Sequence, residues 1–311
     1  MLATLKALAD PTRLRLVAVL ARGELTVQEL TAVFGMGQSR ISRHLKILTE
    51  AGVLTLKRQG TWSYYRLAEE NSFFSAIWPA GAARLAELPG HQADLQGLAR
   101  IFDERRRRSR DFFDLHAASW DGLSERLLPV ADCRDALLQA LPGAGTTMEV
   151  GVGTGGLLVE LGRRTERVVG VDQSAAMLTQ ARLRVEEAGL DNIELRLGEM
   201  SHLPLGDGEV GCAVLNMVLH HAPRPVAVFR EIHRVLGADG RLLVADLQRH
   251  DREWVRETLA DQWLGFDREE LEGWLTEAGF VLESFRLLPG EGRLCAFVLA
   301  ARSLNICQGA A

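Results

Sequence analysis

Apolar residues in the first 50 positions recur every three or four residues, which is the spacing of one face of an α-helix. Two signals mark where helices begin. Asp10 stands directly before Pro11, and Thr26 stands three positions before Glu29 as a capping box. The pattern predicts a helix that starts at Pro11 and ends at Gly23, a helix at 26–33, a glycine-bearing turn at 34–37 and a helix at about 38–51. The last two helices and their turn are typical of a helix-turn-helix.

Residues 53–67 change to the alternation of a β-strand. The segments 53–58 and 62–67 alternate, and a turn glycine lies between them, so the pattern predicts a β-hairpin. Lys57 and Arg58 stand near its tip. We expect this hairpin to lie against a DNA backbone as a wing.

From residue 146 onward, short apolar runs alternate with helical segments. Helices are expected from Gly155 and from Ser174 to Ala188, and the predicted strands are 147–150, 168–172, 193–197, 212–216 and 241–246, with 293–301 closing the series. This order predicts a doubly wound, mostly parallel sheet, the architecture of an α/β Rossmann-like domain. Ligands of such sheets bind at the carboxyl ends of the strands.

Length and charge divide the chain. Its 311 residues are too many for one core, so we expect two domains joined by a connector. Residues 1–66 hold ten Lys and Arg against four Asp and Glu, a net charge of +6, whereas the remainder carries −11. A basic N-terminal block is suited to DNA phosphates, and an acidic body is not.

Other features exclude whole classes of protein. No run of 18 apolar residues and no signal-peptide pattern is present, so we expect a cytoplasmic protein without membrane contact. The cysteines are widely dispersed, and they are Cys133, Cys212, Cys295 and Cys307. Since they form no cluster, the sequence predicts neither a disulfide framework nor a metal site.

The predicted helix at 38–51 has an apolar stripe of Ile41, Leu45 and Leu48. The stripe leaves hydrogen-bond donors on the exposed side of the N-terminal half, where they are suited to base edges and phosphates in a major groove. The DNA-contacting residues that we expect are Gln38, Ser39, Arg40, Ser42, Arg43 and His44, with Lys57 and Arg58 of the hairpin.

The first part of the chain resembles the ArsR-family winged helix-turn-helix repressors over about residues 1–87. The segments that carry this resemblance are ADPTRL at 9–14, SRISRHLK at 39–46 and EAGVL at 50–54. It implies a homodimer that binds an inverted-repeat operator in double-stranded DNA. That family has a thiolate metal site where this chain reads Thr26 and Gln28, so we expect no metal sensing there.

Four apolar residues follow the hairpin, namely Phe73, Phe74, Ile77 and Trp78. Two interpretations are open. They form the seam of the homodimer that the resemblance implies, or they pack inside the core of their own domain.

A glycine-rich loop follows the predicted strand at 147–150. Gly151, Gly153, Gly155 and Gly156 satisfy both G-x-G-x-G and the dinucleotide pattern G-x-G-x-x-G, so the loop alone leaves the ligand open. Asp172 ends the next predicted strand and is placed to accept both ribose hydroxyls of either ligand.

The second part of the chain resembles class I S-adenosylmethionine (SAM)-dependent methyltransferases over about residues 112–302. The segments that carry this resemblance are 112–121, 198–205, 216–221 and 231–240. It implies that SAM or S-adenosylhomocysteine (SAH) binds with its amino-acid end at Glu149, its ribose at Asp172 and its adenine at Glu199 and Met200, beneath a lid residue, Trp120. The full ligand-contacting set is Glu149, Gly151, Gly153, Gly155, Asp172, Gln173, Glu199, Met200, Asn216 and Trp120.

We assign no catalytic residue, because methyl transfer depends mainly on alignment of donor and acceptor. His220, His221, Asp246 and His250 are candidates for a base if the acceptor must lose a proton. In the resembled family the double histidine recurs as a structural or ligand-lining element, and that interpretation also stays open.

The expected domains are a winged helix DNA-binding and dimerisation domain at 1–87, a helical connector at 88–125, a methyltransferase-like domain at 126–302 and a flexible tail at 303–311. The connector holds four consecutive arginines, Arg105–Arg108. We interpret them as a solvated or acid-paired helix face and assign them no DNA contact.

Three functions are compatible with this organisation. The leading one is a transcriptional repressor whose methyltransferase-like domain binds SAM or SAH as an effector, which resembles the SAH-responsive regulators of methionine-cycle genes. The alternative is an active SAM-dependent small-molecule methyltransferase with an attached DNA-binding domain, for which arsenite is a poor acceptor because the cysteines are not grouped. A nicotinamide-dependent redox regulator is compatible with the glycine loop alone.

Overall fold

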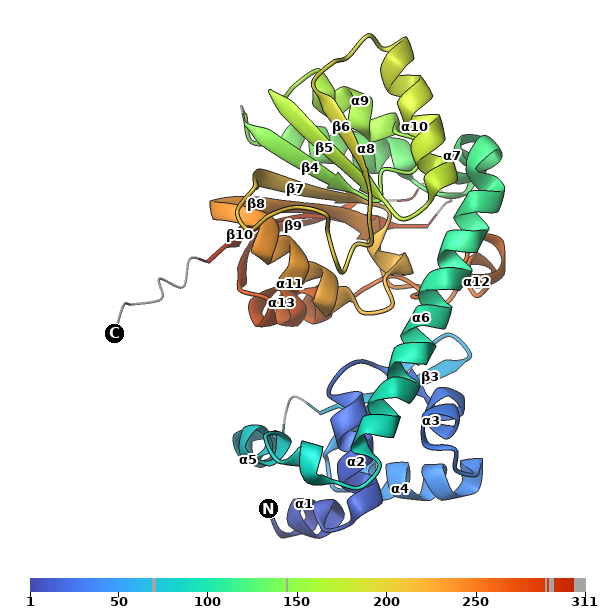
Figure 1. The fold of residues 1–311 in the computed structure, drawn as a ribbon, viewed down its shortest axis with the longest axis vertical. Coiled ribbons are helices and arrows are strands. Elements are labelled where there is room, and N and C mark those ends of the chain that lie inside the picture. The colour runs from blue at the N-terminus through green and yellow to red at the C-terminus, as the bar shows by residue number, and fades with distance from the viewer. Residues whose placement is uncertain (69–70, 144, 289, 291–293, 305–311) are drawn as a thin grey trace. The chain divides into compact units, whose positions relative to one another are not determined.

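The computed structural model describes residues 1–68, 71–143, 145–288, 290 and 294–304. Its chain forms two compact units, Met1–Arg105 and Arg106–Ala311, and the long helix α6 (His91–His116) passes from one to the other (Figure 1). Arg293, Cys307 and residues 305–311 of the predicted tail lie outside the described residues.

The first unit is a helical domain with a small sheet. Its helices before α6 are α1 (Leu2–Leu8), α2 (Pro11–Leu20), α3 (Val27–Phe34), α4 (Gln38–Glu50), α5 (Ser72–Ala82) and the 3-10 helix η1 (Leu85–Glu87), and its strands are β1 (Leu25–Thr26), β2 (Leu54–Gln59) and β3 (Trp62–Leu67). The strand order is β1-β3-β2, and all pairs are antiparallel. The predicted helix-turn-helix and hairpin are both confirmed.

Local hydrogen bonds explain where these helices begin. Asp10 Oδ1 accepts a hydrogen bond from the Arg13 N–H at 3.0 Å at the start of α2. At the start of α3, Thr26 Oγ1 accepts from the Glu29 N–H at 3.2 Å, and Glu29 Oε2 accepts from the Thr26 N–H at 2.8 Å. Each cap satisfies backbone donors that have no partner inside the helix, so the sequence signals act as predicted.

The core of the first unit joins the helix-turn-helix to the helices that follow the hairpin. Leu45 of α4 and Phe74 of α5 are buried in one cluster with Leu98 from the first half of α6. Phe74 is 2% exposed and packs against Trp78 with 5.5 Å between ring centroids. These two aromatic residues therefore pack inside the core of their own domain.

The second unit is a three-layer α/β domain. Its helices after α6 are η2 (Ala117–Ser119), α7 (Trp120–Leu127), α8 (Val130–Ala140), α9 (Gly156–Gly162), α10 (Ala175–Glu187), η3 (Leu219–His221), α11 (Pro225–Val235), α12 (Trp254–Thr258) and α13 (Arg268–Glu277). Its strands are β4 (Thr146–Val150), β5 (Arg167–Asp172), β6 (Ile193–Leu197), β7 (Val210–Asn216), β8 (Leu236–Leu247), β9 (Phe280–Leu288) and β10 (Ala296–Ser303).

The strand order in this unit is β6-β5-β4-β7-β8-β10-β9. The first five strands of that order are parallel, and β10 is antiparallel to both β8 and β9. The α/β Rossmann-like class is confirmed, and the edge strand β9 was not expected. Figure 1 shows α11 and α13 on the opposite side of the sheet from α8, α9 and α10.

The order of the strands reverses at β4, because β5 lies on one side of it and β7 on the other. The connection after β4 runs over one face of the sheet, and the connection after β7 runs over the other (Figure 1). The two connections separate at the carboxyl ends of these strands and leave a crevice there, which is where open α/β sheets bind ligands. One buried cluster of α8, α9 and α10 side chains supports this crevice from one face of the sheet. In the described part of the chain, no helix combines the length and hydrophobicity needed to cross a lipid bilayer.

Candidate functional site

A cavity of about 380 Å³ opens at the carboxyl ends of β4, β5 and β7. This volume lies within the range of pockets that hold small-molecule ligands. The walls come from the loops after these strands and after β6, with α7 and the end of α6 on the remaining side. All of its lining residues belong to the second unit.

Two residues of the glycine loop, Gly151 and Gly153, adopt backbone conformations that favour glycine. Gly151 has a φ of +74°, and a Cβ on it would lie 2.3 Å from Val218 Cγ2, so no larger residue fits. Gly153 has a φ of +53° and lies beside the Trp120 indole, whose Nε1 would be 4.0 Å from a Cβ. Both conformations favour glycine, and both keep the backbone open to a ligand in the pocket.

Gly155 acts differently, because it does not line the cavity. A Cβ on Gly155 would lie 3.1 Å from Ala181 Cα, so this glycine allows α9 to approach α10 closely. That is the packing role expected of the third glycine in such a loop. We therefore remove Gly155 from the ligand-contacting set.

Asp172 ties the end of β5 to the glycine loop. Its Oδ2 accepts a hydrogen bond from the Gly153 N–H at 2.9 Å, and its Oδ1 accepts from the Ser174 N–H at 2.8 Å. Burial raises the pKa of this carboxyl above its usual value, although the backbone hydrogen bonds oppose the shift. The carboxylate remains part of the cavity wall, where it can accept hydrogen bonds from a ligand.

Glu149 presents a carboxylate that the protein does not satisfy. It lies on β4, is 2% exposed and lines the cavity, and among the described residues Oε2 has no hydrogen-bond partner. Burial, followed by the nearby Asp172, raises its pKa well above the usual value. A buried acceptor without a partner is costly, so this position favours a ligand that supplies a cation or a hydrogen-bond donor.

Aromatic residues cover one side of the cavity. The Trp120 and Phe113 rings meet edge to face with 5.0 Å between centroids, and Phe113 meets His221 in the same way at 4.8 Å. Next to Trp120, Asp121 accepts hydrogen bonds from Thr154 and Arg184. These bonds join α7 to the glycine loop and to α10, so the segment predicted as a lid is held over the pocket.

The cavity brings together eight of the ten predicted ligand-contacting residues, namely Glu149, Gly151, Gly153, Asp172, Gln173, Met200, Asn216 and Trp120. Glu199 is outside its walls and lies 3.3 Å from Arg106 Nε in an ion pair. Arg184 lines the cavity and was not predicted, because it reaches the site from the far end of α10 and only packing shows this.

The four candidate bases lie at different distances from the cavity. His221 lines the cavity, whereas His220 is buried behind it and its Nδ1 lies 2.6 Å from Asp246 Oδ1. Burial lowers the pKa of His221 well below its usual value, and His220 lowers it further. Burial, followed by His220, lowers the pKa of His250 to about 4. Of the four candidates, His221 is therefore the one that lines the cavity, and its burial favours the neutral imidazole.

In the first unit, α4 presents the predicted donors as expected. Ile41, Leu45 and Leu48 are buried, and the exposed residues on its N-terminal half are Gln38, Ser39, Arg40 and Arg43. Ser42 and His44 are half-buried, and His44 Nδ1 lies 4.0 Å from Asp10 Oδ1. An exposed, positively charged helix of this kind is suited to a DNA groove.

The two basic residues of the hairpin differ. Arg58 is exposed, but the Lys57 side chain is only 5% exposed and its Nζ lies 3.6 Å from Glu24 Oε2. The alternation of β2 turns Lys57 inward and Arg58 outward. We therefore remove Lys57 from the expected DNA-contacting set.

Two family models match parts of this chain. Residues 10–55 match the model described as "Bacterial regulatory protein, arsR family", and residues 148–244 match the model described as "Methyltransferase domain".

Each of the curated relatives below matches a limited share of the chain. The arsenite methyltransferase of Halobacterium salinarum is 33% identical over 128 residues, which are 39% of this chain and 32% of that protein. The arsenic resistance transcriptional regulator ArsR1 of Pseudomonas putida is 53% identical over 66 residues, which are 21% of this chain and 52% of that protein. Across these and the arsenical resistance operon repressor of Escherichia coli, the chain spans between 32% and 65% of the relatives' length.

Solved structures share the fold of the second unit. One chain of the complex between the Trm112 methyltransferase activator and a methyltransferase of Haloferax volcanii has a TM-score of 0.54 and 18% identity, and the match covers 61% of this chain and 97% of that one. The cyclase SpnF has a TM-score of 0.54 and 17% identity, with 62% and 94% covered. A cyclase with this fold illustrates that function resides in the site rather than in the fold.

Proposed function

We propose that this chain, which joins an ArsR-type helix-turn-helix domain to a class I methyltransferase domain, is a transcriptional repressor whose methyltransferase domain binds SAM or SAH as an effector. The observation that carries the proposal is the unsatisfied Glu149 carboxylate in the cavity of a chain whose other unit exposes basic α4. The proposed targets are genes of the methionine and SAM cycle.

The pocket residues suit both ends of such a ligand. Glu149 would receive the ammonium of the amino-acid end, which supplies the missing donor and a balancing charge. Asp172 would accept the ribose hydroxyls, Met200 would contact the adenine, and Trp120 would cover the nucleoside. A nicotinamide dinucleotide carries a pyrophosphate at the glycine loop, and the buried carboxylate of Glu149 beside that loop opposes a second negative group.

The DNA-binding half of the proposal rests on α4. Gln38, Ser39, Arg40 and Arg43 would contact base edges and phosphates, and Arg58 would contact the backbone beside the groove. Met1, Leu2 and Leu5 leave an exposed apolar face on α1, which supports pairing with a second copy. We propose a homodimer that binds an inverted repeat in double-stranded DNA, with half-sites about one helical turn apart.

Two measurements test the proposal in sequence. Calorimetry with SAM, SAH and NAD identifies the ligand, and we expect heat with SAM or SAH and none with NAD. Operator fragments selected from a DNA library are then titrated with the full chain at one salt concentration, with and without that ligand. We expect operator affinity to change about 5- to 150-fold, which is the usual range of coupling between two sites. Equal affinity in all conditions would reject the effector role.

A second candidate function is methyl transfer to a small molecule. The neutral His221 on the cavity wall favours it, because a base near the ligand is what an acceptor hydroxyl or thiol would need. The likeness to an arsenite methyltransferase adds weight to the reaction class. Arsenite itself is a poor match, since Cys133 and Cys212 are buried thiols whose pKa burial raises to about 12. Transfer of a labelled methyl group to an added acceptor would establish this function. If no methyl group is transferred and DNA binding depends on SAH, the result favours the repressor.

A further inference from the structure

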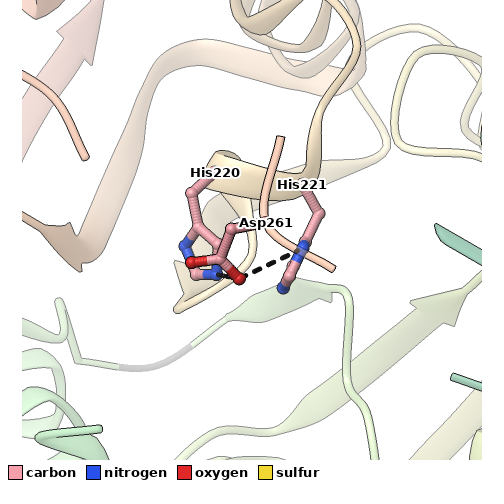
Figure 2. Close-up of side chains that lie close together, drawn as sticks. All are labelled: His220, His221 and Asp261. Carbon is pink, nitrogen blue, oxygen red and sulfur yellow. Dashed lines mark ion pairs between the residues drawn. The ribbon is translucent and has the colours of Figure 1, made fainter. Parts of the chain in front are cut away.

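Three titratable side chains meet beside the cavity, and of these only His221 has a role in the functions proposed above. His220 and His221 lie on η3 directly after β7, and Asp261 lies in the segment after α12. One ligand atom from each lies within 4.8 Å of the others, and all three residues are buried. Figure 2 shows the Asp261 carboxylate beside the imidazole rings of His220 and His221, with dashed lines for the ion pairs.

Within the part of the chain that the structure describes, three polar atoms of this cluster have no hydrogen-bond partner, whereas His221 Nδ1 lies 3.4 Å from Ala260 O. Among the described residues, His220 Nε2 and both carboxylate oxygens of Asp261 accept or donate no hydrogen bond, although the His220 and Asp261 side chains are 0% exposed. His220 Nε2 lies 3.6 Å from Asp261 Oδ1, which is too long for a hydrogen bond. A buried carboxylate and a buried imidazole nitrogen that lie side by side without hydrogen-bond partners are suited to hold a cation between them.

We infer that His220, His221 and Asp261 bind one divalent transition-metal ion, with zinc as the ion that fits best. Tetrahedral zinc holds its nitrogen and oxygen ligands at about 2.0–2.2 Å, which places neighbouring ligand atoms about 3.3 Å apart. The observed separations from Asp261 Oδ1 are 3.6 Å to His220 Nε2 and 3.9 Å to His221 Nδ1. Small rotations of the side chains therefore close the site around an ion.

The surroundings of His220 are those of a metal-binding histidine. Its Nδ1 lies 2.6 Å from Asp246 Oδ1, and Asp246 is itself fixed by the Leu219 N–H at 2.8 Å and the Leu247 N–H at 2.7 Å. A carboxylate on the far ring nitrogen fixes the imidazole so that its other nitrogen is free to coordinate. Asp246 is thus the orienting residue of the proposed site and does not touch the ion.

Asp261 is held in place by its own backbone neighbours. The N–H groups of Gln262 and Trp263 both donate to the His220 carbonyl at 3.0 Å, and the Trp263 indole donates to Ala222 O at 2.8 Å. Ala260 adopts a φ of +58°, an uncommon conformation that turns the chain toward η3. The loop is therefore prearranged to present the carboxylate to both histidines.

Charge balance supports a dication. The carboxyl groups of Asp246 and Asp261 lie in a dry interior beside the two histidines, and one divalent ion would balance the charge of both carboxylates. Arg256 also lies near Asp261, but its Nε is 3.3 Å from Glu253 Oε2 in an ion pair. Two imidazoles and one carboxylate are a donor set of zinc and of other late divalent metals, and a fourth position stays open.

The proposed ion adjoins the ligand pocket, because His221 lines that pocket as well as belonging to the cluster. The open fourth position would take a water or the polar group of a second substrate. This inference stands on the cluster itself. Failure of SAM or SAH to bind would not remove it, and failure of zinc to bind would leave the ligand measurements unaffected.

The test measures metal on the full chain, purified through a tag that contains no histidine. After removal of metal with a chelator, zinc is titrated in competition with a chromophoric chelator, and cobalt is added separately as a spectroscopic probe. We expect about one zinc per chain and a visible cobalt absorption band typical of a four-coordinate site. A zinc content below about 0.1 per chain with no cobalt band would overturn the inference.

Variants locate the ion. We expect Asp261→Asn to lose the cobalt band and His202→Gln, an exposed histidine outside the cluster, to keep it. Asp246→Asn should weaken zinc binding about 10- to 100-fold through lost orientation of His220. If Asp261→Asn does not fold, His221→Ala replaces it. Equal zinc binding by wild type and both cluster variants would show that the metal binds elsewhere and would also overturn the inference.

Discussion

We expect Glu149→Gln to raise the stability of the unligated protein and to weaken its affinity for the ligand. Both effects arise because the carboxylate oxygen Oε2 of Glu149 has no hydrogen-bond partner among the described residues until a ligand binds. The folded-state pKa of Glu149 is raised above the unfolded value by burial and by Asp172, so its charged form costs stability at neutral pH, and that cost disappears as the pH falls through the folded pKa. Glutamine has nearly the same shape and no charge. Removing a buried, unsatisfied polar charge is worth about 1–3 kcal/mol.

For a domain of this size, each kcal/mol raises Tm by about 2–4 °C, so we expect a gain of about 2–12 °C. The same substitution removes a charge-assisted hydrogen bond to the ammonium of SAM or SAH, which contributes about 1.5–3 kcal/mol. Binding should therefore weaken about 10- to 150-fold. The effect on unligated protein and the effect on the complex have opposite signs because only the ligand satisfies Glu149 Oε2.

Calorimetry with SAH and thermal unfolding of the unligated protein measure the two effects. Glu166→Gln is the matched control, because Glu166 is exposed on the same unit and outside the pocket, and it should change neither quantity. Unchanged SAH affinity in Glu149→Gln would refute the assignment of this carboxylate to the ligand. A loss of stability together with affinity would show that Glu149 has a structural partner instead.

Gly151→Ala places a methyl group 2.3 Å from Val218 Cγ2 at a positive φ, so the free energy of unfolding measured in denaturant should fall by about 1–3 kcal/mol and SAH binding should weaken; unchanged stability would contradict the loop geometry. SAH affinity measured from about pH 8 to about pH 5 should fall on acidification, because burial raises the pKa of Asp172 and a protonated carboxyl accepts ribose hydrogen bonds poorly, whereas Asp172→Asn should show a flatter profile. Arg40→Gln should weaken operator binding by about 1–3 kcal/mol, and an unchanged affinity would exclude this arginine from the interface. Lys57→Gln should leave the salt dependence of operator binding unchanged and lower stability, since the ammonium is buried in an ion pair; a smaller salt slope would return Lys57 to the DNA-contacting set.

Local signals account for what was predicted in the first unit. The Asp10 cap and the Thr26 capping box act over three residues, so the sequence contains every group that forms them. The position of Lys57 shows the limit of such reasoning. Alternation in β2 shows that Lys57 and Arg58 face opposite sides, but only the location of Glu24 and the core reveals which side is inward.

The strand β9 was missed because its pattern is irregular. Its register against β10 shifts between Ala300 and Ala301, where Glu283 is the extra residue of a bulge. The bulge interrupts the alternation on which a strand prediction depends, and as an edge strand β9 buries few of its side chains. Glu199 was expected at the adenine from the methyltransferase resemblance, whereas in the fold it pairs with Arg106 outside the cavity wall.

By itself the sequence determined most of the elements, the two-part organisation and most of the pocket, since turns, caps and strand ends are set by residues close together in the chain. Only the tertiary structure decided which charges are buried, that Glu149 Oε2 lacks a partner, and that Asp261 meets His220 across 40 positions of sequence. The distance between His220 and Asp261 in the sequence matches no known metal-binding motif. Their proximity arises from packing of the segment after α12 against η3, and packing depends on contacts that no local pattern records.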